Sequence, residues 1–351
     1  MTRILLTRNR LAGGCILAVG LMLLCGLNLT KVWAAGPTRV SLGTLAPRGS
    51  IYHQSLQSMA EKWRQAPGGG VRLVIYPDGT QGGEADMVRL MRVGTLQAGL
   101  LTTVGLSELE PGVAGLQSFP LAFRDFDEFD YVNQRLRPMM ERRLAEKGFV
   151  MLFWADAGWV RYFFKEPIST PEELKQRKLF AWSGSVEQVD IMKQLGYNPV
   201  PLETADILTS LQTGLINAVS VPPIYAARSQ FHSYAPHMLD LKWAVLVGGL
   251  VIKQSTWESI PPETRKVLAE AAEAAGREIQ ANGRKEGDEA VAAMEKRGLQ
   301  VRRLTPELEA RWVAAAAETY PKIRGTIVPA DIFDEVQRLL KEYRSSSSPS
   351  P

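Results

Sequence analysis

The three histidines of the chain are the first side chains to test for metal or acid–base chemistry, and they are His53, His232 and His237. His232 and His237 are five residues apart, which on a helix places them about 140° from each other, on different faces. A metal site needs several ligands that converge on one point. We therefore expect no metal site and no cofactor.

Motifs of covalent and nucleotide chemistry are also missing from the sequence. There is no Gly-x-Ser-x-Gly elbow, no phosphate-binding loop and no dinucleotide fingerprint, and the glycine run Pro67–Gly70 lacks the lysine and Ser/Thr that a phosphate loop requires. The acid pair Glu172 and Glu173 lies in the first turn of a predicted helix, where acidic residues stabilise the helix N-terminus. An enzyme is the least expected function.

Aromatic side chains are the more informative group, because several of them lie on or near predicted strands and could line an apolar pocket. Most aromatic residues near strands belong to a core, so we expect only two or three of them to contact a ligand. The candidates are Trp159, Tyr162, Phe163, Phe164, Trp182, Tyr225 and Trp243.

The elements that would position these residues form two α/β series. In the first, predicted strands at Val40–Leu42, Val71–Ile75 and Ala98–Leu101 alternate with helices at Ile51–Arg64 and Glu84–Val93. This alternation is typical of a mostly parallel sheet with helices on both faces.

A second series begins near Gly158, and its later strand at Trp243–Ile252 is expected to return the chain to the first lobe. Two lobes joined by crossing strands make a cleft, and small ligands bind in such clefts. The other predicted elements are a strand at Trp159–Phe164, a helix that starts at Pro171 after its cap Thr170, a strand at Lys178–Ala181, a helix from Ser185 to Leu195, a helix at Ala205–Thr213 capped by Thr204, a strand around Ile216–Val219 and a helix after Pro222 and Pro223.

A long helix is predicted at Glu263–Arg297, with apolar residues at helical spacing and charges between them. Gly276, Gly283 and Gly287 are expected to weaken this helix and to permit a bend. The segment Arg344–Pro351 has the composition of a disordered tail.

The first 34 residues have the pattern of a cleavable secretory signal, with three arginines, an apolar run and small residues before the expected cleavage after Ala34. An uncleaved anchor is the alternative, and processing at Cys25 as a lipoprotein is a minority interpretation. Both cysteines, Cys15 and Cys25, lie in this segment, so the remainder contains none. Four of the 41 basic residues also lie there, which leaves 37 against 37 acidic residues and predicts no nucleic-acid binding.

Several motifs resemble one protein family, in family order, among them Gly94–Ala98 and Trp257–Glu263. Pro171–Trp182 reads Pro-Glu-Glu-Leu-Lys-Gln-Arg-Lys-Leu-Phe-Ala-Trp and resembles the family pattern Pro-Glu-Asp-Leu-Lys-Gly-x-Lys-Ile-Arg-x-Pro. Tyr76–Glu84, Pro120–Asp125 and Ser210–Gly214 resemble three further motifs, and the likeness covers nearly all of residues 39–300. The chain is thus similar to the periplasmic solute receptors of TRAP transporters, the DctP family.

The resemblance implies an α/β, two-lobed periplasmic binding protein of type II-like fold, with crossing hinge strands and a long bracing helix. It predicts the following division: residues 1–34 as signal peptide, 35–157 with 247–265 as lobe I, 158–246 with 298–343 as lobe II, 266–297 as the helix that spans both lobes, and 344–351 as tail.

Carried onto matching positions, the resemblance also nominates the ligand-binding residues. From lobe I they are Thr44, Ser50, Thr102 and Thr103, although capping or turn bonding explains the hydroxyls equally well. From lobe II the resemblance nominates Phe180, Trp182, Ser220 and Val221. The aromatic residues Trp159 and Tyr225 and the candidate cation Arg161 complete the predicted ligand-binding set.

Phe180 stands where the family has the arginine that clamps a ligand carboxylate, and Ser220 and Val221 replace two polar cleft positions. A hydrogen bond to a charged group contributes about 1.5–3 kcal/mol, so this loss favours a neutral or largely apolar ligand. Arg161 is the candidate replacement. It lies one residue beyond the family's second arginine position, at Val160, and one step along a strand turns a side chain to the other face.

Three functions follow from these features. The first is a periplasmic solute receptor that closes two lobes around a ligand and delivers it to TRAP-type permease subunits. The second is a periplasmic carrier of a hydrophobic or lipid-like molecule that serves another transport system. The third is a sensor or adaptor that binds no small molecule.

Overall fold

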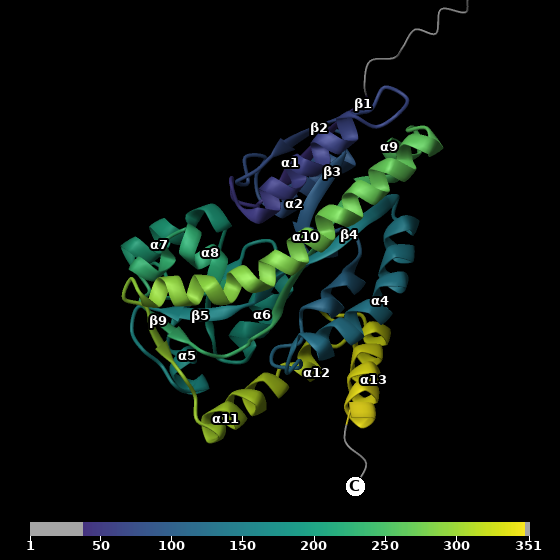
Figure 1. The fold of residues 1–351 in the computed structure, drawn as a ribbon. Helices are drawn as coiled ribbons and strands as arrows, with labels where there is room; N and C mark the ends of the chain where they lie inside the picture. Colours follow the sequence, from purple (N-terminus) through teal and green to yellow (C-terminus); the bar gives the residue numbers. More distant parts are fainter. Residues whose placement is uncertain (1–37, 348–351) are drawn as a thin grey trace, which may run out of the picture. The chain divides into compact units, whose positions relative to one another are not determined.

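A five-stranded sheet forms the core of lobe I in the computed structural model, which describes residues 38–347, all within one compact unit, Ala35–Pro351 (Figure 1). Its strand order is β2-β1-β3-β10-β4. β1 pairs in parallel with β2 and β3, whereas β10 lies antiparallel between β3 and β4. The strands are β1 (Thr38–Thr44), β2 (Val71–Tyr76), β3 (Ala98–Thr102), β4 (Phe149–Trp159) and β10 (Val245–Lys253).

A six-stranded sheet forms lobe II, in the order β11-β9-β5-β8-β6-β7. β8 pairs in parallel with β6 and antiparallel with β5. The strands are β5 (Arg161–Phe164), β6 (Lys178–Trp182), β7 (Asn198–Leu202), β8 (Ala218–Val221), β9 (His237–Leu239) and β11 (Gln300–Arg302). The predicted two-lobed α/β architecture is therefore confirmed.

The two lobes are joined where β4 gives way to β5. The sequence predicts one strand at Trp159–Phe164, but the structure divides it at Val160. The backbone of Val160 exchanges hydrogen bonds with the crossing return segment, donating to the Ala244 carbonyl at 2.8 Å and accepting from Trp243 N at 3.2 Å. The return strand then enters the lobe I sheet as β10, as expected.

The first helix of lobe I begins where the sequence places its cap. The Ser50 hydroxyl accepts from the backbone N–H of His53 at the start of α1. The longest of these helices, α4, has no counterpart among the predicted elements. The helices are α1 (Ile51–Arg64), α2 (Glu84–Arg92), α3 (Thr103–Ser107), η1 (Pro111–Leu116), α4 (Phe126–Glu146) and α9 (Gln254–Glu258).

The helices of lobe II are shorter. α5 starts with a capping box, in which Thr170 accepts from the backbone of Glu173 and the Glu173 carboxylate accepts from the backbone of Thr170, so this acidic residue is structural, as expected. The helices are α5 (Pro171–Lys175), α6 (Val186–Gln194), η2 (Thr204–Asp206), α7 (Ile207–Thr213), α8 (Pro223–Arg228) and η3 (Phe231–Ser233).

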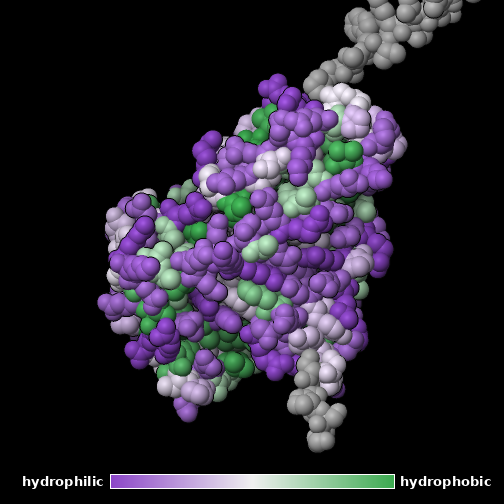
Figure 2. Space-filling model, in the orientation of Figure 1, coloured by the Kyte–Doolittle hydropathy of each residue, from purple (hydrophilic) through white to green (hydrophobic). Residues whose placement is uncertain are grey.

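One long helix, α10 (Pro262–Glu295), packs on β4 and α1 of lobe I and on α8 of lobe II. Figure 2 shows that the face of the molecule along which α10 runs is mostly hydrophilic. Its glycines permit close packing. A Cβ atom at Gly276 would lie 2.7 Å from Phe153 Cβ, and one at Gly283 would lie 3.0 Å from the Tyr52 hydroxyl.

The C-terminal segment connects the lobes a further time, which differs from the predicted assignment of 298–343 to lobe II. α11 (Pro306–Ala317) packs on α5 and buries Trp312 in lobe II, and α12 (Tyr320–Ile323) follows. α13 (Ala330–Ser347) lies beside α4, where Figure 1 shows it in yellow, and buries Val336 among the lobe I core.

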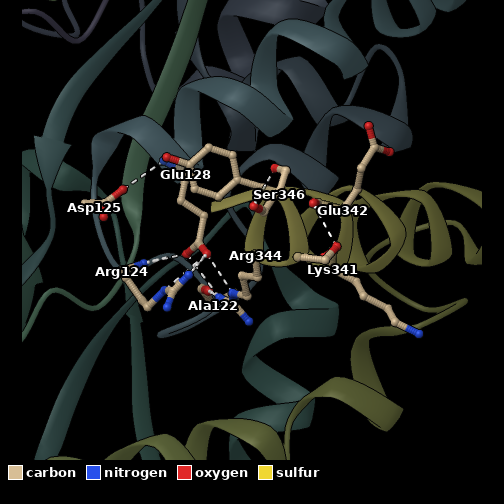
Figure 3. A network of polar contacts seen from close by, with 10 residues as sticks. Ala122, Arg124, Asp125, Glu128, Lys341, Glu342, Arg344 and Ser346 are labelled. Carbon is tan, nitrogen blue, oxygen red and sulfur yellow. Dashed lines mark hydrogen bonds and ion pairs between the residues drawn. The ribbon is translucent and has the colours of Figure 1, made fainter. Parts of the chain in front are cut away.

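Arg344 fastens α13 to α4 (Figure 3), and residues 344–347 are helical, which differs from their predicted place in a disordered tail. Its Nε and Nη2 donate to the fully buried Glu128 carboxylate at 2.6 and 3.0 Å, and Nη2 also donates to the Ala122 carbonyl at 2.6 Å. Arg124 donates to the same carboxylate through its backbone and side chain. Residues 348–351 and the predicted signal peptide at 1–34 lie outside the described residues.

Within residues 38–347, we find no helix with the length and apolar character that a membrane crossing requires.

Candidate functional site

A cavity of about 130 Å³, here called cavity 1, lies between the lobes. Lobe I contributes the loop after β1 and parts of β3, β4 and β10, and lobe II contributes the ends of β6 and β8 together with α8. Most of its wall is apolar. Representative wall residues are Leu45, Leu100, Ala155, Leu246, Trp182, Val221 and Ile224.

The threonine and serine hydroxyls that lobe I brings to cavity 1 already have partners. Thr44 Oγ1 accepts from the backbone of Ala46 at 3.1 Å. Ser50 Oγ donates to the Pro47 carbonyl at 2.6 Å and accepts from His53 N at 3.3 Å. Thr44 therefore stabilises the loop after β1, and Ser50 caps α1. Both side chains contribute mainly van der Waals surface to the cavity wall.

Glu84, at the first position of α2, is the acidic residue in this part of the wall, and it too is saturated. Its carboxylate accepts from the backbone N–H and hydroxyl of Thr102 at 2.7 and 2.6 Å and from the backbone of Gly105 at 2.8 Å. Burial raises the pKa of Glu84 despite these hydrogen bonds. Glu84 joins α2, β3 and α3 behind the cavity wall.

Asp156 of β4 is compensated by an arginine of the long helix. Arg284 donates to both oxygens of Asp156, at 2.7–3.2 Å, and to both oxygens of Asp130 at 2.6 and 2.8 Å. Burial by itself lowers the pKa of Arg284, but the hydrogen bonds to these carboxylates outweigh it and raise the pKa. Arg284 has little hydrogen-bonding capacity left for a ligand.

Beside cavity 1, where α1, α8 and α10 meet, three polar side chains are poorly satisfied, and one of them, Glu286, lies outside the cavity wall. The Tyr52 hydroxyl and Glu286 Oε2 are buried and have no hydrogen-bond partner among the described residues. Arg228 Nη2 lies 3.9 Å from Glu286 Oε2, which is too far for a hydrogen bond. Burial, reinforced by Asp156 and Glu286, raises the pKa of Tyr52 well above its ordinary value. Tyr52 and Arg228 line the cavity.

A second cavity of about 410 Å³, here called cavity 2, lies beside α6 and α12 and shares Trp182 with cavity 1. Its wall mixes aromatic, aliphatic and polar side chains, and its charged wall residues are Glu108 and Glu187. Tyr162, Phe180 and Trp243 line it as well.

The structure distributes the predicted ligand-binding residues over both cavities. Alternation along β8 contributes to this division, because Ser220 and Val221 face opposite sides of the sheet. Cavity 1 is lined by Thr44, Ser50, Thr102, Trp182, Val221 and Tyr225. Cavity 2 is lined by Thr103, Phe180, Trp182 and Ser220. Contact of any of these residues with a ligand remains a prediction.

Arg161 and Trp159 lie outside the walls of both cavities, which differs from the prediction. Arg161 is buried, its Nη2 lies 3.5 Å from Asp240 Oδ1, and its Nε and Nη1 have no partner among the described residues. Burial lowers the pKa of Arg161. Trp159 packs against Phe126, with ring centroids 5.1 Å apart. Neither residue replaces the missing clamp at Phe180 in this conformation.

Sequence reasoning did not single out Tyr52, Arg228 or Glu286. No motif marks them, because they come from α1, α8 and α10 and meet only when the two lobes and the long helix are assembled. Glu84 did lie within a quoted motif, Tyr76–Glu84. Within the described part of the chain, no three His, Cys, Asp or Glu side chains are grouped so that they could hold a metal ion.

Two α/β lobes around an interlobe cavity, with crossing strands and a bracing helix, define a two-lobed solute-binding protein. The model of the DctP family, bacterial extracellular solute-binding protein family 7, matches residues 42–325, and the chain belongs to this family. Its members are periplasmic solute-binding receptors. The C4-dicarboxylate-binding periplasmic protein DctP of Rhodobacter capsulatus is 23% identical over 267 residues, which cover 73% of this chain and 76% of the relative.

Solved structures share the fold. A TRAP periplasmic solute-binding protein of Xanthobacter autotrophicus Py2 with bound β-D-galacturonate has a TM-score of 0.78 and 20% identity, covering 86% of this chain and 99% of its own. A TRAP periplasmic solute-binding protein of Ralstonia eutropha H16 with bound (S)-2-acetolactate has a TM-score of 0.79 and 22% identity, covering 87% of this chain and 99% of its own.

Proposed function

We propose that this protein is the periplasmic receptor of a TRAP-type transporter, and that it captures a compact ligand with a largely apolar body in cavity 1. The observation that carries the proposal is an apolar cavity built by both lobes and lined by six of the predicted ligand-binding residues. In this proposal residues 1–34 direct export, the protein catalyses no reaction, and its partners are the TRAP membrane subunits.

The size of cavity 1 supports a small ligand. An engineered apolar cavity of about 150 Å³ accommodates benzene, so about 130 Å³ suits a hydrocarbon group of four to six carbons. The ligands named for the relatives, C4-dicarboxylate, β-D-galacturonate and (S)-2-acetolactate, all carry a carboxylate. The apolar wall of cavity 1 favours a less polar ligand than these.

Closure of the lobes supports the receptor mechanism. Glu203 of lobe II lies against Gly83 of lobe I, where a Cβ atom would collide with its carboxylate, so the lobes meet at this side of cavity 1. A ligand that contacts both lobes binds the closed state better than the open state and shifts the population toward it. The membrane subunits would recognise that closed state.

The test is mass spectrometry of compounds released by denaturing gently purified protein, followed by thermal shifts with separate panels of carboxylates and neutral apolar compounds. A ligand at 100 times its dissociation constant adds about 2.7 kcal/mol to the free energy of unfolding. Leu246→Trp, which fills cavity 1, should abolish the shift, whereas Gln188→Trp in cavity 2 should preserve it. No released compound and no shift in either panel would contradict the proposal.

Cavity 2 supports a second candidate, a carrier of a larger hydrophobic molecule for another transport system. Its volume is about three times that of cavity 1, and Phe180, Tyr162 and Trp243 provide aromatic surface. In that case Gln188→Trp abolishes binding and Leu246→Trp does not, so the same two variants distinguish the candidates. A released lipid would favour the carrier.

A further inference from the structure

Cavity 2 contains a buried side chain whose hydroxyl has no protein partner. Tyr162 of β5 is 3% exposed and lines this cavity, and its hydroxyl forms no hydrogen bond within residues 38–347. The hydroxyl is not one of the fully enclosed polar atoms, so it is accessible from the cavity. Ser220, which lies opposite Tyr162 on β8, brings a second hydroxyl to the same face of the sheet. Because buried polar groups are normally hydrogen-bonded, we expect Tyr162 to bond to a molecule inside the cavity.

The ring of Tyr162 is held in place, and its hydroxyl stays protonated. The ring packs edge-on against Trp243, with ring centroids 5.1 Å apart. Burial, reinforced by Tyr197, raises the pKa of Tyr162 well above its ordinary value. The hydroxyl can therefore both donate and accept a hydrogen bond. Phe180 and Trp182 add further aromatic surface, so the interior of cavity 2 suits a flat apolar body that carries a hydrogen-bonding group.

The charged side chains in the wall of cavity 2 are both acidic. Glu108 follows α3 of lobe I and Glu187 lies in the first turn of α6 of lobe II, and both are exposed to solvent. Among residues 38–347, no lysine, arginine or histidine lines this cavity. Arg92 is close, but it donates to the backbone carbonyl of Glu108, at 2.5 Å, and not to the carboxylate. An anion that enters is therefore repelled by both lobes, whereas a cation is attracted to both.

We propose that cavity 2 is a second ligand site and that it binds an organic amine, a compound with an aromatic or aliphatic body and a protonated amino group. The body lies against Tyr162 and Trp243, and the amino group lies at the exposed part of the wall that carries Glu108 and Glu187. An apolar cavity of about 150 Å³ holds benzene, so about 410 Å³ has room for two fused rings and a short side chain. The inference rests on the site of the second candidate function and is independent of the receptor function proposed for cavity 1.

The first measurement compares matched probes by calorimetry with the full mature chain. Tryptamine, tryptophol and indole-3-acetate share one indole ring and differ in the charge of the side chain. Octylamine, octanol and octanoate repeat the comparison with an alkyl body. In at least one series the amine should bind about tenfold more tightly than the acid, with the alcohol between them, because two exposed carboxylates attract one and repel the other. Added salt should narrow this difference, since it screens exposed charges.

The second measurement repeats the titrations with substituted proteins, each checked for folding by circular dichroism. Glu187→Gln should weaken tryptamine binding by about two- to fivefold and leave tryptophol binding unchanged, because it removes one exposed charge. Asp190→Asn is the matched control, since Asp190 is exposed on the same helix but lies outside the wall of cavity 2, and it should bind as the wild type does. Tyr162→Phe should weaken tryptamine and tryptophol alike by about fivefold, because it removes a neutral hydrogen bond. Gln188→Trp, which fills cavity 2, should abolish both.

The inference is overturned if the acids bind as tightly as the amines in both series, or if no probe binds. Equal effects of Glu187→Gln and Asp190→Asn also overturn it, because the attraction then does not come from the cavity wall. So does tryptamine binding that survives Gln188→Trp and is lost in Leu246→Trp, since the amine then lies in cavity 1. The receptor function stands in each of these cases if denaturation releases a compound whose binding Leu246→Trp abolishes. It fails if no compound is released and neither panel shifts the melting temperature, whatever the amines do.

Discussion

Two arginine–glutamate pairs in this protein use the same residue types in opposite ways. Glu128 is fully buried and accepts hydrogen bonds from both Arg344 and Arg124, with Arg344 Nε at 2.6 Å. Arg228 and Glu286 lie 3.9 Å apart without a hydrogen bond, and one oxygen of Glu286 is buried and unpartnered within the described residues.

The difference separates charged groups that stabilise the fold from charged groups that remain able to bind another partner. A saturated charged network holds elements together, here α13 on α4, because removing one member leaves another charge without its partner. A pair that is close but unsatisfied adds little stability and retains capacity for a ligand. Arg284, which bonds two aspartates, belongs to the first kind, although it lies near cavity 1.

The largest expected effect on stability comes from Glu128, the carboxylate of the saturated network. Glu128→Gln removes the charge that Arg344 and Arg124 share and should lower the free energy of unfolding by about 2–3 kcal/mol, since hydrogen bonds to charged groups are the strong ones. Urea denaturation measures the change. Ligand affinity should be unaffected, because Glu128 lines neither cavity. An unchanged unfolding midpoint would show that the network does not hold α13.

The pH dependence sharpens the same comparison. Burial alone raises the pKa of Glu128, but the hydrogen bonds from Arg344 and Arg124 outweigh it and hold the pKa below its ordinary value. Its contribution to stability is therefore present above the ordinary carboxyl pKa and is lost as the pH falls through the lowered value.

The stability difference between wild type and Glu128→Gln should accordingly shrink below about pH 4. Denaturation midpoints of both proteins between about pH 3 and pH 7 test this expectation. A difference that stays constant over that range would mean that Glu128 acts through packing and not through its charge.

Gly283→Ala is expected to break the unsatisfied cluster while leaving the saturated one intact. The new Cβ would lie 3.0 Å from the Tyr52 hydroxyl and 3.2 Å from the Asp156 carbonyl, so α10 or Tyr52 must shift. Such overpacking costs about 1–3 kcal/mol. Because Tyr52 lines cavity 1, calorimetry with the compound that denaturation releases should show weaker binding.

Gly287→Ala is the matched control on the same helix. A Cβ at Gly287 would meet nothing within 4 Å, so the substitution should raise stability by about 0.5–1 kcal/mol through helix propensity and leave binding unchanged. Equal behaviour of the two alanine variants would contradict the close packing of Tyr52 on α10.

Much of the fold could be predicted from local sequence patterns. The period of apolar residues and the caps at Ser50 and Thr170 placed α1 and α5 correctly, because these signals act over a few residues. The attachment of α13 could not be predicted in this way. It depends on Arg344 meeting Glu128, which is distant in sequence, and the serine-rich composition after Arg344 indicated disorder instead.

In the candidate site too, residues marked by local sequence patterns could be predicted, and residues brought together by tertiary packing could not. Residues from quoted motifs or strand ends, such as Thr102 and Val221, do line cavity 1. The direction of Arg161 was not predictable, because a one-residue offset on β5 decides which face it takes and Asp240 holds it there. Arg228 and Tyr52 were missed, since their proximity arises only from packing of α1, α8 and α10.

The smallest expected change in stability comes from Glu286→Gln. Its pair with Arg228 is long and both side chains are partly exposed, so the free energy of unfolding should change by no more than about 0.5 kcal/mol. Ligand affinity should also stay the same, because Glu286 lies outside the walls of both cavities. Calorimetry with the compound that denaturation releases measures the affinity of both proteins. A tenfold or larger change would show that Glu286 reaches the ligand and that the pair with Arg228 belongs to the binding site.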